Sequence, residues 1–178
     1  KNNLYALNIC KQEIGRENCA IMVEGYMDVI ACHQAGISNV VAPLGTALTE
    51  EQVKLLMRYS YNFITSFDGD NAGIRATLKS IDLIEKSGGK ARVLLIPEGK
   101  DPDEYIKAYG IDAFQDILKQ AVNGHAFRLA QAMKKYPGDS MDQKLSVLNE
   151  VLRNMAQIRQ PAELDMVIRY TADRLFLS

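Results

Sequence analysis

The sequence has 178 residues, 47% of them hydrophobic, and a formal net charge of −1. This size and apolar content predict one folded domain or slightly more, and the charge excludes a protein that coats nucleic acid by bulk positive charge. Three cysteines without a CxxC pair, and no apolar run near the roughly 18 residues of a membrane span, predict a cytoplasmic protein without a disulfide framework.

The first 111 residues alternate short apolar strands with helices. After a lead-in over 1–17, strands are predicted at 18–23, 39–42, 62–67 and 91–96. Helices are predicted at 26–35, 49–60 and 72–86, and another begins at residue 101. This alternation is typical of a sheet buried on both faces. We therefore predict an α/β, Rossmann-like domain over 18–111 with a mainly parallel four-stranded sheet.

The remaining residues, 112–178, predict only helices, at 112–122, 125–136, 140–158 and 161–177. One apolar stripe at helical spacing consists of Leu145, Leu148, Leu152 and Met155. The simplest interpretation is a C-terminal helical bundle. Because the sequence begins at Lys1 rather than Met, we expect it to be a piece of a longer protein.

Acidic residues follow three of the predicted strands. Glu24 follows the first strand, Asp68 and Asp70 follow the third, and Asp101 and Asp103 follow the fourth. Ligands bind outside the carboxyl ends of parallel strands, so these carboxylates are expected on one rim if the first and third strands are neighbours. Carboxylates 4 Å apart repel by about 4 kcal/mol per pair, which favours a bound cation. Oxygen ligands select hard ions, hence Mg²⁺ or Mn²⁺.

Simpler explanations exist for each acidic element. Asp68-Gly69-Asp70 alone is commonly a turn, and Asp101 before Pro102 is a good helix start. Only the conjunction of three elements on one rim favours the metal site. Asp28, one helical turn beyond Glu24, is a candidate further ligand or supporting acceptor. The loop over 44–48 is expected on the same rim.

Four stretches resemble, in order and spacing, the TOPRIM domain of bacterial replicative DNA primases of the DnaG type. They are EGYMDVI at 24–30, LGTA at 44–47, DGDNAG at 68–73 and GKDPD at 99–103. The resemblance is strong over about residues 4–110. It is weak beyond them, where the helices contain no distinctive motif. It implies a lead-in from a missing N-terminal subdomain at 1–17, a TOPRIM domain at 18–111 and a helical subdomain at 112–178.

The resemblance implies metal-dependent nucleotidyl transfer: synthesis of short RNA primers on a single-stranded DNA template from ribonucleoside triphosphates. It assigns catalytic roles to Glu24, Asp68 and Asp70, and metal ligation to these three together with Asp101 and Asp103. Glu24 is either a ligand or a general base. The implied supporting residues are Asp28, Gly25, Gly45, Thr46 and Gly69.

Three parts of such primases are not recognised in this sequence. They are a zinc-binding module, the basic half of the polymerase core, and the domain that contacts the replicative helicase. Zinc is therefore expected only outside this chain, the helicase contact is expected through an absent domain, and the isolated chain is expected to be weakly active or inactive. The alternatives are a fragment of another TOPRIM nuclease or topoisomerase, and a non-catalytic TOPRIM scaffold that binds DNA or protein.

Overall fold

The computed structural model describes residues 3–43, 47–67 and 69–177. These form two compact units, Lys1–Gly124 and His125–Ser178. The first unit therefore extends beyond the predicted boundary at residue 112, because the chain continues onto the sheet as far as β6 (Val122–Asn123). It also includes the predicted lead-in over 1–17, which forms β1 (Leu4–Tyr5) and α1 (Leu7–Glu17). No helix among the described residues is long and apolar enough to cross a membrane.

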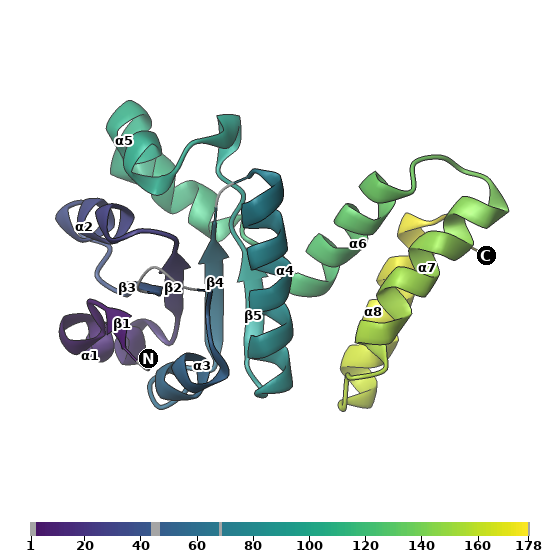
Figure 1. Ribbon diagram of the computed structural model, residues 1–178, viewed down its shortest axis with the longest axis horizontal. Coiled ribbons are helices and arrows are strands. Elements are labelled where there is room, and N and C mark those ends of the chain that lie inside the picture. The colour runs from purple at the N-terminus through teal and green to yellow at the C-terminus, as the bar shows by residue number, and fades with distance from the viewer. Residues whose placement is uncertain (1–2, 44–46, 68, 178) are drawn as a thin grey trace. The chain divides into compact units, whose positions relative to one another are not determined.

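The sheet of the first unit has the strand order β1-β3-β2-β4-β5-β6, and Figure 1 labels its strands β1 to β5. The four central strands are β2 (Ala20–Val23), β3 (Val40–Pro43), β4 (Asn62–Ser66) and β5 (Lys90–Val93). They pair in parallel, which confirms the predicted α/β class, while the two-residue strands β1 and β6 add antiparallel edges. β5 ends at Val93 rather than at the predicted Ile96.

β2 and β4 are neighbours, which is the condition for the carboxylates that follow them to lie on one rim of the sheet. Ala20 pairs with Phe63 and Val23 with Ser66, so both strands end at the same level. The chain leaves β2 for β3 on one side and then crosses to β4 on the other side. The carboxyl ends of β2 and β4 therefore form the topological switch point, where ligands of doubly wound sheets bind.

Helices cover both faces of the sheet. On one face, Ile21, Val23 and Ile64 share an apolar core with α2 (Tyr26–Gln34) and α5 (Pro102–Lys119). Side chains alternate along a strand, so Phe63 points to the opposite face. There a Cβ on Gly89 would meet Phe63 and Ile84 of α4 (Asn71–Lys86) at 2.9 Å. α4 contacts α3 (Glu50–Leu56), and Figure 1 shows α4 alongside β4 and β5.

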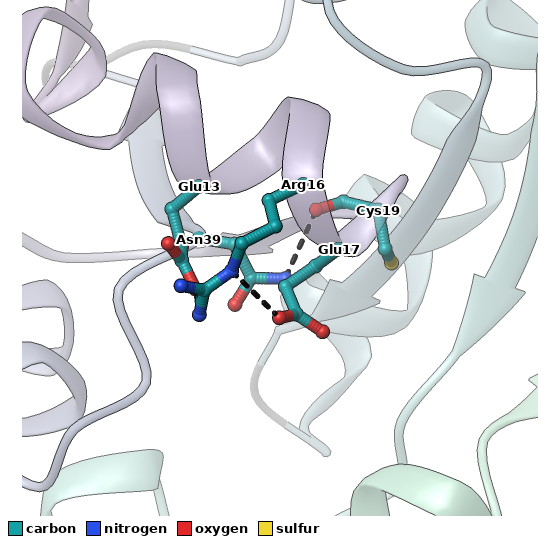
Figure 2. A network of polar contacts seen from close by, with 5 residues as sticks. All are labelled: Glu13, Arg16, Glu17, Cys19 and Asn39. Carbon is teal, nitrogen blue, oxygen red and sulfur yellow. Dashed lines mark hydrogen bonds and ion pairs between the residues drawn. The ribbon is translucent and has the colours of Figure 1, made fainter.

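The turn from α1 into β2 is tied to the chain that enters β3 (Figure 2). The buried Asn39 donates a hydrogen bond from Nδ2 to the Cys19 carbonyl at 2.9 Å, and its own carbonyl accepts from Ile21 N at 3.0 Å. Arg16, at the end of α1, pairs with Glu13 and Glu17. The two Asn39 contacts tie the start of β2 to the chain that enters β3.

The helix that begins at Pro102 is interrupted at Gly110, whose φ of 81° lies in the left-handed region that glycine adopts most readily. A helical break close to the predicted one at residue 112 is therefore present. Its second part buries Phe114 against the sheet, so this segment belongs to the first unit rather than to the bundle.

The second unit contains α6 (Gly124–Lys135), α7 (Met141–Met155) and α8 (Pro161–Arg174). Its core comprises Leu129, Ala132, Val147, Val151, Met155 and Leu175. The predicted leucine stripe on α7 is partly wrong, because Leu145 and Leu152 are 46% and 44% exposed. The buried stripe of α7 lies about 100° around the helix, on Val147, Val151 and Met155.

Candidate active site at the strand ends

A cavity of about 430 Å³ opens at the carboxyl ends of β2 and β4. We call it the strand-end cavity. Among the residues that the structure describes, its charged lining residues are Glu24, which follows β2, Asp70, which follows β4, and Lys79 of α4. The other lining residues are Pro43, Ala47, Leu48, Phe67, Ala72, Gly73, Ala76 and Ser80. The fold thus brings two of the predicted metal ligands, distant in sequence, to one cavity.

Asp70 is held by the helix that follows it. Its Oδ1 accepts a hydrogen bond from Gly73 N at 2.7 Å, which caps the N-terminus of α4. The partial positive charge of a helix N-terminus stabilises a carboxylate there. The cap fixes the direction of the carboxyl group, and a carboxylate has further lone pairs to offer a cation.

Asp28 supports the turn that carries Glu24. Its Oδ2 accepts from Gly25 N at 3.1 Å, and the side chain is buried. A Cβ on Gly25 would meet the same oxygen at 3.2 Å, so a larger residue there would crowd the turn. Asp28 does not line the strand-end cavity among the residues described; it positions the backbone next to Glu24.

Asp101 and Asp103 do not line the strand-end cavity in the described part of the chain. Asp101 caps α5 through Glu104 N at 2.7 Å, and Asp103 pairs with Lys107 at 2.6 Å. Between β5 and α5 the chain passes through η1 (Pro97–Gly99) and its flanking residues.

Asp103 nevertheless lies on the same side of the sheet as Asp28. Burial raises the pKa of the Cys32 thiol to about 12, and the charges of Asp28 and Asp103 add to that rise. Both carboxylates therefore lie near Cys32, where α2 packs against α5.

Three predicted site residues, Asp68, Gly45 and Thr46, lie outside the described residues. Gly69 is exposed, and a Cβ there would meet nothing within 4 Å. Within 3–43, 47–67 and 69–177, no group of three or more His, Cys, Asp or Glu side chains is close enough to hold a metal ion. The ligand set of five carboxylates therefore stays a prediction.

The contribution of α4 to the cavity lining was not predicted from the sequence. Ala72, Ala76 and Lys79 line the cavity at a spacing of four and then three residues, which places them on one face of the helix. Their helical spacing after Asp70 is the feature of the sequence that could have predicted this shared face.

A larger cavity of about 810 Å³ is lined by residues of β1, α1, α2 and α3. Its polar lining includes Lys11 and His33, and no carboxylate of the described residues lines it. It offers apolar surface rather than a cation site, so the candidate chemistry lies in the strand-end cavity.

Comparison with known proteins gives matches for both units. Residues 21–106 match the Toprim-like family, and residues 126–178 match the family described as the DnaB-helicase binding domain of primase. The DNA primase of Clostridium acetobutylicum is 38% identical over 173 residues, which are 97% of this chain and 28% of that protein. The DNA primase of Enterococcus faecalis is 35% identical over 100% of this chain and 29% of its own length. The chain spans less than a third of these relatives.

Solved structures agree in fold. The DnaG primase catalytic domain bound to single-stranded DNA has a TM-score of 0.85 at 29% identity, over 97% of this chain and 56% of that one. The Escherichia coli primase catalytic core gives the same TM-score and identity over 98% of this chain and 56% of its own.

The comparison supports the expected helicase contact but places the matching segment inside this chain. The helicase-contacting domain was expected outside this chain, yet residues 126–178 match the helicase-binding family. Apolar helical stripes carry no motif that distinguishes a binding bundle from a structural one, so the helices gave no local signal of this relationship.

Proposed function

Because this chain belongs to the DnaG-type DNA primase family, we propose that it forms the metal-binding part of a primase catalytic core. In this role it takes part in the synthesis of short RNA primers on single-stranded DNA from ribonucleoside triphosphates, in the cytoplasm. The reaction is a metal-dependent nucleotidyl transfer.

The proposal rests chiefly on one observation: Glu24 and Asp70 line the same cavity at the switch point between β2 and β4. The donors available there are carboxylate oxygens, and small side chains of α4 leave room beside them. Such a donor set suits Mg²⁺ or Mn²⁺, with water and phosphate oxygens completing the coordination. When bound, the ion supplies Lewis-acid stabilisation of the charge that develops during phosphoryl transfer.

The chain's own residues then hold and orient this ion. Glu24, Asp70 and their sequence neighbour Asp68 are the proposed first ligands, with Glu24 alternatively accepting the proton of the attacking hydroxyl. Asp28 keeps the turn at Gly25 in place. Asp101 and Asp103 remain predicted ligands of a further ion.

We also propose that the helical unit, 125–178, contacts the replicative helicase. The support is its match to the helicase-binding family and its own apolar core, which lets it present a surface independently of the sheet.

A crystal soaked in Mn²⁺ tests the metal site. Anomalous density within about 2.5 Å of a Glu24 or Asp70 carboxylate oxygen is expected. The variant E24Q should lower Mn²⁺ affinity measured by calorimetry at least about tenfold, because it replaces an ionised ligand with a neutral one.

The matched control is D116N, since Asp116 is an exposed carboxylate of α5 that pairs with Lys119 and does not line the cavity among the described residues. It should bind Mn²⁺ like the parent chain. Crystals without anomalous density at the strand-end cavity at millimolar Mn²⁺ would contradict the proposed function.

A further inference from the structure

We propose that Lys79 binds a phosphate group inside the strand-end cavity. This inference rests on the proposed function, because it adds an anion-binding group to the proposed cation site. The phosphate belongs either to a nucleoside triphosphate or to the backbone of a nucleic acid, and the two sources share the same chemistry.

Lys79 reaches this cavity because of how α4 begins. The cap at Asp70 sets the start of the helix, and Lys79 follows Ala72 and Ala76 along the face that lines the cavity. The alanines are too short to fill the space between the charged residues. The lysine and the two carboxylates, Glu24 and Asp70, therefore face one solvent-accessible volume.

Within residues 3–43, 47–67 and 69–177, the ammonium group of Lys79 has no carboxylate partner. Three other helical lysines pair with a carboxylate one turn away: Lys54 with Glu50 at 2.5 Å, Lys107 with Asp103 at 2.6 Å and Lys119 with Asp116 at 2.8 Å. Lys79 makes no ion pair with any residue that the structure describes.

The chemistry of the cavity selects a phosphate rather than another ligand. Two carboxylates repel an anion on their own, but a divalent ion held by them attracts one. Beside such an ion, Lys79 would add a second positive charge, and its ammonium group would donate hydrogen bonds to a phosphate oxygen. Most of the other lining residues, among them Pro43, Leu48 and Phe67, have apolar side chains. The volume of about 430 Å³ falls in the range of small-ligand sites.

Three variants of the 178-residue chain test the assignment. K79Q removes the charge, K79R keeps it, and K86Q is the matched control. Lys86 is exposed on the same helix, about two turns further on, and does not line the cavity. Affinities for ATP with Mn²⁺ are measured by calorimetry, and affinities for a fluorescent single-stranded DNA by anisotropy across a salt series.

K79Q is expected to weaken binding of one of the two probes at least about tenfold, the loss typical of a charged hydrogen bond. K79R should stay within about threefold of the parent, and K86Q should match it. A loss confined to ATP identifies a nucleotide phosphate. A loss confined to DNA, with the salt slope reduced by about one, identifies a backbone phosphate.

Equal affinities of K79Q and K86Q for both probes would overturn the inference, as would a parent chain that binds neither. Calorimetry with Mn²⁺ alone separates this from the proposed function. A chain that binds Mn²⁺ but shows no effect of K79Q retains the metal site and loses the phosphate site. ATP binding that depends on Lys79, in a chain that binds no Mn²⁺, would support the phosphate site and contradict the metal site.

Discussion

Asp70 combines two tasks that are usually separate. It caps α4 through Gly73 N, and it lines the strand-end cavity opposite the chain end of β2. The cap orients the carboxyl group before any cation arrives, so less ordering remains to be done on binding. Substitutions of Asp70 should therefore separate its contribution to helix capping from the contribution of its negative charge to cation binding.

Replacing Asp70 in two ways tests this at the residue scale. D70N keeps a capping side chain, so the free energy of unfolding should change by less than about 0.5 kcal/mol, while Mn²⁺ affinity falls at least about tenfold. D70A should also lose Mn²⁺ affinity and in addition lose about 1 kcal/mol of stability. Urea unfolding and calorimetry give the two values. Equal Mn²⁺ affinity of D70N and the parent would exclude Asp70 as a ligand.

At the scale of single elements, α7 shows that tertiary packing determines which face of a helix is buried. Two apolar stripes run along it, one through Leu145 and Leu152 and one through Val147 and Val151. Both have helical spacing, so periodicity alone cannot rank them. The valine stripe is buried because its side chains meet Leu129 and Ala132 of α6 and Leu175, just beyond the end of α8.

Neighbouring residues of α7 provide a matched pair. V151A should lower the free energy of unfolding by about 2 kcal/mol, because it removes two buried methyl groups and leaves a cavity. L152A removes more atoms, yet should lower it by less than about 1 kcal/mol, since Leu152 is 44% exposed. Urea unfolding compares the two. A larger loss for L152A would mean that the leucine stripe is the packed one.

At the scale of the whole molecule, the thiols report on how tightly the sheet unit is packed. Burial raises the pKa of Cys10 and Cys19 to about 11 and that of Cys32 to about 12, from a model-peptide value of 9.0. All three lie in the first unit, on α1, at the entry to β2 and on α2. The folded state therefore keeps these protons at pH values where the unfolded chain releases them.

The stability of the chain should consequently fall as the pH rises above about 9. Between pH 9 and 11 the unfolded state binds fewer protons than the folded state, so each thiol lowers the unfolding free energy by up to about 1.4 kcal/mol per pH unit. Below pH 8 the contribution is fully present and constant. Urea unfolding from pH 7.5 to 10.5 measures the slope, and the triple variant C10A/C19A/C32A should flatten it. An unchanged slope in that variant would assign the loss to other groups.

Much of the fold could be predicted from local pattern. The four central strands, the helices between them and the caps at Thr49, Asp70 and Asp101 all follow from short-range signals. The edge strands β1 and β6 could not be predicted, because two residues are too few for a periodic signal and their pairing is with distant partners. Of the candidate site, Glu24 and Asp70 were recognisable at strand ends, whereas Lys79 depended on which face of α4 turns to the cavity.

By itself, the sequence determined the alternation of strands and helices, the acidic residues that end the strands, and the resemblance to primases, because all three are patterns along the chain. Only the tertiary structure decided the strand order that makes β2 and β4 neighbours, and so brings Glu24 and Asp70 to one cavity. It also decided that Asp101 caps α5, that Asp103 pairs with Lys107, and that the valine side of α7 is buried. Strand order and choice of face depend on contacts between residues far apart in sequence, whose free energies no local pattern contains.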